Sequence, residues 1–154
     1  MPRFSIDTNI LVYSFDASAG WRHRLAHDII AAAKQVDCWL TLQSVGETYA
    51  ALTRKRKTTA QAADAIVEGL LQLFPTISHS EASVRQGARD AAAGRLSFWD
   101  AVLVATAGEA GCTAVLSEDM ADGARFGAVE IVNPFAGPRL SDRAAALLGL
   151  SNPP

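Results

Sequence analysis

The chain has 154 residues, of which 49% are hydrophobic and 19% are charged, and this composition predicts one globular domain and excludes a disordered chain. Its net charge of −2 gives no general attraction to nucleic acid, so any such binding requires a local basic patch. No apolar run approaches the ~20 residues of a membrane span and no signal segment is visible, so we expect a cytoplasmic protein.

Strands and helices are predicted to alternate along the chain. In chain order we expect a strand at 3–6, helices at 9–15 and 20–36, a strand at 38–42, a helix that Ser44 opens and that ends in the basic run 54–57, a helix at 58–74, an extended piece at 76–77, helices at 80–93 and from Ser97 to Gly111, and strands at 113–117 and 129–132. Such alternation indicates βαβ crossovers and a mostly parallel sheet that helices cover on both faces. Cys38 and Cys112 lie in apolar sequence and are best explained as unpaired, buried thiols.

Four acidic residues fall where an ordinary helix surface does not place them. Asp7 follows the first strand, and Glu47 lies in the first turn of the helix after the second strand. Asp100 lies in the first turn of the apolar helix FWDAVLVATA, and Asp119 follows the strand TAVLS. The C-terminal ends of parallel strands and the starts of the following helices share one edge of a sheet, where ligand sites form. We therefore expect these four carboxylates to converge.

Helix capping is the alternative role for these acids. Asp7 is a good N-cap residue, and the pairs Ser44/Glu47 and Ser97/Asp100 have the spacing of a capping box. Capping alone, however, gives no reason for the acids to share an edge. Several anions packed together repel, and a bound divalent cation relieves that repulsion. A set of oxygen ligands suits Mg²⁺ or Mn²⁺ and not Zn²⁺.

Four segments carry a resemblance to a known family, namely IDTNIL, ETYAAL, SFWDAVLVATA and VLSEDM. In this order they resemble the PIN-domain ribonucleases, and in particular the VapC-type toxins of toxin–antitoxin pairs, over residues 3–135. The resemblance implies a three-layer PIN-like α/β fold with a central, mostly parallel sheet of four to five strands flanked by helices. The chain then divides into a PIN-like nuclease domain, 1–135, and a C-terminal appendage, 136–154, made of a short helix and a loose tail.

The same resemblance implies a metal-dependent endoribonuclease that inhibits translation. Its acidic site binds one or two Mg²⁺ or Mn²⁺ ions, which neutralise the phosphodiester and activate a water molecule. The matching positions are the catalytic and metal-binding Asp7, Glu47, Asp100 and Asp119 and the accessory polar residues Asn9 and Ser117. Glu118 is the alternative to its neighbour as the fourth acid, although Ser-x-Asp spacing favours Asp119, and Asp122 is either an outer acid or an ordinary loop residue.

The partners implied by the resemblance are an RNA substrate, a cognate antitoxin and a second copy of the chain in a homodimer, with no membrane. The densest positive run, Arg54, Lys55, Arg56 and Lys57, is either a solvated helix end or a phosphate-binding rim beside the acidic site. The helix at 58–74 is either plain core or, as in VapC-like proteins, part of the antitoxin groove and dimer surface. Trp99 is expected in a core or interface, with base stacking as the lesser alternative.

Two other functional classes compete with the nuclease. A haloacid-dehalogenase-type phosphatase also begins with a strand that ends in Asp, but it normally needs a second Asp two residues later, where this chain has Asn9. The non-enzyme alternative is a protein-binding module in which the acids only cap helices. Covalent catalysis is unsupported, because no Ser-His-Asp or Cys-His arrangement is evident.

Overall fold

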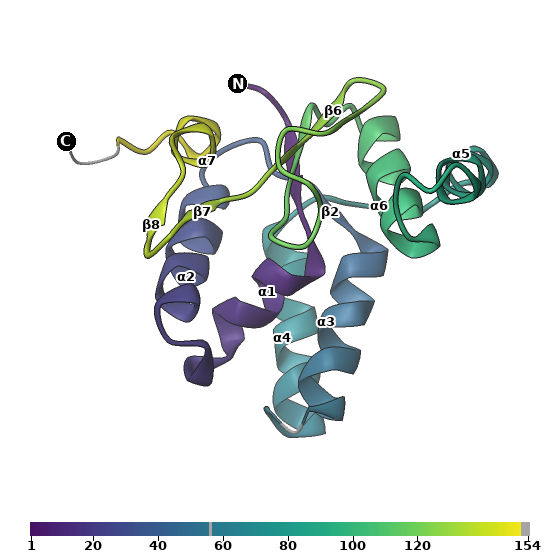
Figure 1. Cartoon of the computed structure of the whole chain (residues 1–154). Helices are drawn as coiled ribbons and strands as arrows, with labels where there is room; N and C mark the ends of the chain where they lie inside the picture. Colours follow the sequence, from purple (N-terminus) through teal and green to yellow (C-terminus); the bar gives the residue numbers. More distant parts are fainter. Residues whose placement is uncertain (56, 152–154) are drawn as a thin grey trace.

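A computed structural model describes residues 1–55 and 57–151 of the protein (Figure 1). In chain order the elements are β1 (Phe4–Ile6), α1 (Thr8–Phe15), a 3-10 helix η1 (Ala17–Ala19), α2 (Trp21–Ala33), β2 (Leu40–Thr41), α3 (Leu42–Arg54), α4 (Ala60–Leu73), β3 (Thr76–Ile77), α5 (Glu81–Ala92), α6 (Phe98–Glu109), β4 (Ala114–Leu116), β5 (Arg125–Phe126), β6 (Val129–Val132), β7 (Phe135–Ala136), β8 (Arg139–Leu140) and α7 (Asp142–Leu148). No helix among them combines the length and the apolar character that crossing a lipid bilayer requires.

The central sheet has the strand order β1-β4-β6-β5. Strand β4 pairs in parallel with β1 and with β6, and only the edge strand β5 is antiparallel. Strands β2 and β3 form a second parallel pair, which a parallel bridge between Phe4 and Cys38 connects to β1. The predicted mostly parallel sheet is therefore confirmed.

Both faces of the sheet are buried under helices. Successive strand side chains point to opposite faces, so Leu116 packs into one buried cluster with Ile10 of α1 and Ile29 of α2, whereas Val115 packs into another with Leu103 of α6. Figure 1 places α2 and α7 on one side of the strands and α5 and α6 on the other. The three-layer α/β arrangement predicted from the sequence is thus confirmed.

The helix after the second strand begins earlier than the sequence suggests. Thr41, and not Ser44, is the N-cap of α3, and its side chain accepts a hydrogen bond from the Ser44 backbone N–H. The Ser44 hydroxyl donates to the Thr41 carbonyl oxygen instead. Glu47 therefore lies in the second turn of α3 and not in the first, which corrects the predicted helix start and the predicted capping box.

The C-terminal part of the chain packs onto the domain as far as the structure describes it. The hairpin of β7 and β8 was not predicted, and neither was β5; each of these strands has only two residues, too few for an alternating pattern to be visible in the sequence. Ala144 and Leu148 of α7 are buried in the same cluster as β1. The boundary at residue 135 stays a prediction, and the final part of the predicted tail, 152–154, lies outside the described residues. Cys38 and Cys112 are buried and unpaired, as predicted.

Candidate active site

Asp7 is fixed at the end of β1 by three hydrogen bonds. Its backbone N–H donates to the Leu116 carbonyl oxygen (2.9 Å). Its carboxylate accepts from the backbone N–H of Thr8 at Oδ1 (2.8 Å) and from the Ser117 hydroxyl at Oδ2 (2.8 Å). The side chain is only 6% exposed. Asp7 therefore caps α1, which confirms the helix-capping role considered for it. The same contacts hold the carboxylate in one orientation.

All four predicted acids line a single cavity of about 490 Å³. They come from the start of α1, the second turn of α3, the first turn of α6 and the loop after β4. The remaining lining residues are Thr8, Asn9, Val12, Tyr13, Ala50, Ala51, Arg54 and Lys55. The structure thus brings together residues from four separate parts of the sequence, as the parallel-sheet argument predicts.

Capping does not account for Asp100 and Asp119. Ser97 is the N-cap residue of α6 but makes no side-chain capping hydrogen bond, so the predicted box with Asp100 does not form. Among the described residues, the carboxylates of Asp100 and Asp119 make no hydrogen bond and no ion pair. Both repel the carboxylate of Asp7. Both acids are therefore free to bind a ligand in the cavity.

The carboxyl group of Asp7 resists ionisation. Burial, opposed by the hydrogen bonds from Ser117 and Thr8 and assisted by the negative charges of Asp100 and Asp119, raises the pKa of Asp7 from 3.8 to about 6. Burial is the largest cause of this shift, and the two neighbouring negative charges add to it. A positive ligand that offset this repulsion would lower the pKa again.

Glu118 is engaged in a structural contact and leaves Asp119 as the fourth acid of the cavity. The Glu118 carboxylate accepts a hydrogen bond from the Tyr13 hydroxyl (2.7 Å) and pairs with Arg22 (2.8 Å). This contact ties the loop after β4 to α1 and α2, so it positions the neighbouring Asp119. Asp122 accepts a hydrogen bond from the Asn133 backbone (2.8 Å) and does not line the cavity.

The basic run divides into two parts. Arg54 and Lys55 line the acidic cavity. Lys57 instead pairs with Asp16 (3.5 Å) and donates to the Ser18 hydroxyl (3.0 Å), which joins the end of α3 to η1. Arg56 lies outside the described residues. The first two cations are therefore the ones placed to meet an anionic ligand.

Asn9 is the one accessory residue whose polar atoms remain unsatisfied. Both its Oδ1 and its Nδ2 are buried and make no hydrogen bond to a described residue, although the residue lines the cavity. Buried polar atoms are normally paired, so a side chain of this kind beside carboxylates fits a site that orders a water molecule or another ligand. Ser117, by contrast, is already bonded to Asp7.

A comparison with protein families identifies the fold. Residues 5–121 match the PIN domain family, which is most of the chain and includes all four acids. The protein belongs to the PIN-domain family. This family match argues against the haloacid-dehalogenase-type phosphatase, which the N-terminal strand ending in Asp7 had suggested. A comparison with curated proteins gave no significant match.

Solved structures with the PIN fold are similar to this chain at low sequence identity. The VapC20 toxin of Mycobacterium tuberculosis, described as cleaving the sarcin-ricin loop, is 20% identical with a TM-score of 0.64, over 75% of this chain and 89% of that one. A toxin–antitoxin complex from Klebsiella pneumoniae is 21% identical with a TM-score of 0.61, over 85% and 97%. VapBC2 of Rickettsia felis, bound to promoter DNA, is 11% identical with a TM-score of 0.59, over 84% and 96%.

The residues of this PIN domain fit a divalent cation. PIN-domain nucleases generally use divalent metal ions, and the donors available here are carboxylate and amide oxygens, which Mg²⁺ and Mn²⁺ prefer. Within residues 1–55 and 57–151, no group of three or more His, Cys, Asp or Glu side chains is arranged to hold a metal ion by itself. Mg²⁺ does not need such a cage, because it keeps several waters and commonly binds one or two carboxylates together with substrate phosphate.

Three residues near the acids were not predicted as part of the site. Tyr13 follows Asn9 by four residues and so shares its face of α1, a spacing that the sequence offered. Thr8 donates to Glu47 Oε2 (3.4 Å), and Gln43 donates to Glu47 Oε1 (2.6 Å). The Gln43 contact depends on the true start of α3, which the sequence did not reveal.

The pKa of Asp7 gives a pH dependence of stability. The folded state keeps the Asp7 proton up to about pH 6, whereas the unfolded state loses it near 3.8. Protonation therefore stabilises the fold below that range, and the benefit is lost as pH rises through it. In EDTA, the free energy of unfolding of wild type relative to Asp7→Asn should fall by about 3 kcal/mol between pH 2 and pH 7.

Denaturant unfolding at several pH values measures this difference. Asp64→Asn, at an exposed position of α4, is the matched control and should show no such trend relative to wild type. A constant difference between wild type and Asp7→Asn across the range would mean that Asp7 ionises normally in the folded protein.

Proposed function

We propose that this PIN domain is a metal-dependent endoribonuclease and the toxin of a type II toxin–antitoxin pair that inhibits translation. The observation that carries the proposal is the cavity in which Asp7, Glu47, Asp100 and Asp119 meet beside two cations. Family membership supports hydrolysis of nucleic acid, and the fold likeness to toxins of such pairs supports the biological role.

One or two carboxylates of the set Asp7, Glu47, Asp100 and Asp119, together with Asn9 and water, would hold Mg²⁺ or Mn²⁺. When bound, the metal neutralises phosphodiester charge and lowers the pKa of a bound water. Asp7 supplies a donor whose direction is set by Ser117 and Thr8, and such fixed donors lose little freedom on binding. Asp100 and Asp119 contribute negative charge without competing contacts among the described residues.

The cations of α3 give the cavity its attraction for RNA. An anionic backbone approaching four carboxylates is repelled, and the protein's net charge of −2 offers no compensation. Arg54 and Lys55 line the same cavity as Glu47, so they can hold phosphates that flank the reacting one. The cavity should therefore attract RNA weakly when no metal is bound and more strongly when a metal is bound.

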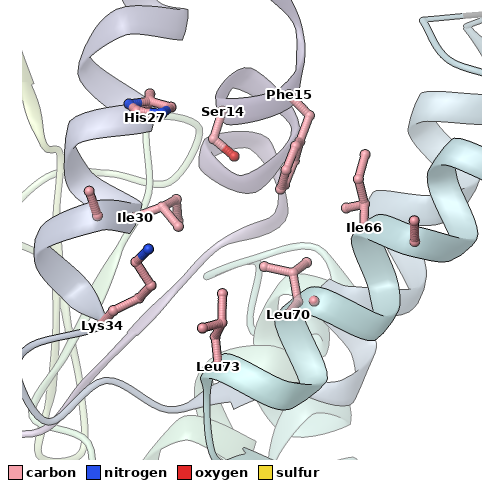
Figure 2. A pocket seen from close by; sticks show the side chains of 11 residues that line it. Ser14, Phe15, His27, Ile30, Lys34, Ile66, Leu70 and Leu73 are labelled. Atoms are coloured by element: carbon pink, nitrogen blue, oxygen red, sulfur yellow. The ribbon is translucent and has the colours of Figure 1, made fainter.

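A separate apolar cavity of about 410 Å³ suits the antitoxin. It lies between the end of α1, α2 and α4, and Figure 2 shows Phe15, Ile30, Ile66, Leu70 and Leu73 pointing into it from these elements. Phe15 and Leu73 are 36% and 52% exposed, which is unusual for large apolar side chains that serve only the core. We assign this surface to an apolar helix or strand of the antitoxin.

The predicted homodimer rests on family likeness, and the predicted cytoplasmic location rests on the sequence. Light scattering of the purified protein tests the first. The binding-module alternative predicts a protein that gains no thermal stability from Mn²⁺, in wild type and in Asp100→Asn alike. The nuclease hypothesis predicts that Mn²⁺ raises the thermal stability of wild type and raises that of Asp100→Asn less. The reason is that a ligand that binds only the folded state stabilises it.

Purified wild-type protein should cleave cellular RNA with Mg²⁺ or Mn²⁺ and should stop when EDTA is added. Asp7→Asn and Asp100→Asn should each lower the rate at least about 100-fold, because each removes a charged metal ligand. Asp64→Asn should cleave as wild type does. Rates come from gel analysis of end-labelled RNA. Full metal-dependent activity in both site variants would show that the site is assigned wrongly.

The antitoxin surface predicts a difference between two leucines of the same helix. Leu73 lines the apolar cavity, whereas Leu71 is 40% exposed and does not. A small reading frame immediately upstream should encode the antitoxin. Co-expression of that antitoxin with this protein should relieve the growth arrest that this protein causes when expressed alone. Leu73→Glu should weaken the co-purified complex by about tenfold or more, since it places an unpaired charge in an apolar contact, and Leu71→Glu should not. Equal binding of both variants would assign the antitoxin to another surface.

A further inference from the structure

A second hollow adjoins the acidic cavity. It has a volume of about 520 Å³ and is lined by Leu42, Gln43, Glu47, Ser78, His79 and Trp99. Glu47 lines both cavities, so the two are neighbours along α3. A substrate in the acidic cavity that extends past Glu47 therefore meets the second hollow next.

Trp99 presents a large aromatic side chain in this hollow. It is 53% exposed and directly precedes Asp100 in the first turn of α6. Its ring packs against Phe98 at 4.9 Å and 75°, and against His79 at 6.0 Å and 58°. These contacts restrict the ring while leaving about half of the residue accessible, a combination that suits stacking with a flat ligand.

Gln43 fixes the same hollow and leaves an acceptor without a partner. Its Nε2 donates to Glu47 Oε1 (2.6 Å) and to the backbone oxygen of Trp99 (3.0 Å), which joins α3 to the start of α6. Its Oε1 is buried and makes no hydrogen bond to a described residue. Gln43 lines the hollow, so a rotation of its side chain would present this oxygen to a donor there, such as the exocyclic amine of a nucleobase.

One face of α3 connects this hollow with the cations. Gln43, Glu47, Ala51 and Arg54 are spaced by four, four and three residues, so their side chains follow one face of the helix. The rise of 1.5 Å per residue makes this face about 16 Å long, equal to about five nucleotides at the 3.4 Å spacing of one stacked strand. Along this face of α3 the neighbouring side chains change from the aromatic Trp99, through the acidic Glu47, to the basic Arg54.

We propose that Trp99, His79 and Gln43 form a nucleobase-binding subsite for single-stranded RNA. The inference rests on the proposed nuclease function and specifies its substrate. An unpaired base stacks on Trp99 and donates to Gln43 Oε1. The reacting phosphate lies at the four acids, and phosphates farther along the strand lie at Arg54 and Lys55. Duplex RNA is excluded from this arrangement, because its bases are stacked on each other and paired.

A second copy of the chain is the competing occupant. The hollow is lined by six residues, whereas a stable protein interface takes roughly 20–30 residues from each partner. Its dimensions and its shared wall with the acidic cavity favour a single base of a bound strand. Self-association through this face is one of the outcomes that the experiment distinguishes.

Binding of RNA that cannot be cleaved tests the subsite. The probe is a fluorescein-labelled pool of random single-stranded octaribonucleotides, titrated in Mg²⁺ with protein carrying Asp7→Asn. Adding Trp99→Ala should raise the Kd by about tenfold, within the range for loss of one stacked base, and Trp99→Phe should raise it less than Trp99→Leu. Tyr49→Ala is the control, because Tyr49 is an aromatic residue of α3 that is 38% exposed and lines neither cavity. An eight-base-pair RNA duplex should bind more weakly and with no dependence on Trp99.

The outcomes separate this inference from the nuclease itself. An unchanged Kd in Trp99→Ala, or an equal loss for the duplex, overturns the subsite even when wild type cleaves RNA. A dimer that Trp99→Leu dissociates in light scattering, with RNA binding unaffected, assigns the face to self-association and also overturns it. Conversely, a wild type without metal-dependent cleavage refutes the nuclease, whereas Trp99-dependent binding of the single strand still supports the subsite.

Discussion

Ile6 and Leu116 lie opposite each other in the parallel pairing of β1 with β4, so the residues that follow them leave the sheet at the same edge. The Ser117 hydroxyl then reaches the Asp7 carboxylate, and the loop beyond it presents Asp119 to the same cavity. Helices α3 and α6 begin near this edge and complete the acidic set. The register of two three-residue strands therefore determines which carboxylates can act together.

The same register imposes an electrostatic cost on the fold. Asp7 is buried and close enough to Asp100 and Asp119 for their charges to raise its pKa, so at neutral pH the metal-free fold contains a buried charge facing two others. Helix capping and the Ser117 hydrogen bond offset part of that cost. A divalent cation would offset the repulsion among the three carboxylates, which is why we propose that the acidic cavity is a binding site and not a by-product of capping.

Much of this arrangement could be predicted from the sequence, because it depends on where strands end. Asp7 and Asp119 follow strands, Asp100 lies in the first turn of a helix and Glu47 lies in the second turn of α3. Their convergence therefore depends mainly on the parallel topology. Contacts between surface side chains could not be predicted. The pairing of Glu118 with Tyr13 and Arg22, and of Lys57 with Asp16, depends on the relative placement of helices. Strands β5, β7 and β8 and the Thr41 cap of α3 were missed, because short local patterns permit several starts.

The pKa of Asp7 with and without metal tests the central claim, that the convergent carboxylates form a cation site. Carbon-13 NMR of the aspartate carboxyl groups, assigned through Asp7→Asn, follows that titration directly. If the convergent carboxylates bind a cation, the pKa of Asp7 will be near 6 in EDTA and, in saturating Mg²⁺, below the ordinary value for aspartate, roughly 3.9. The same pKa in both conditions would contradict it.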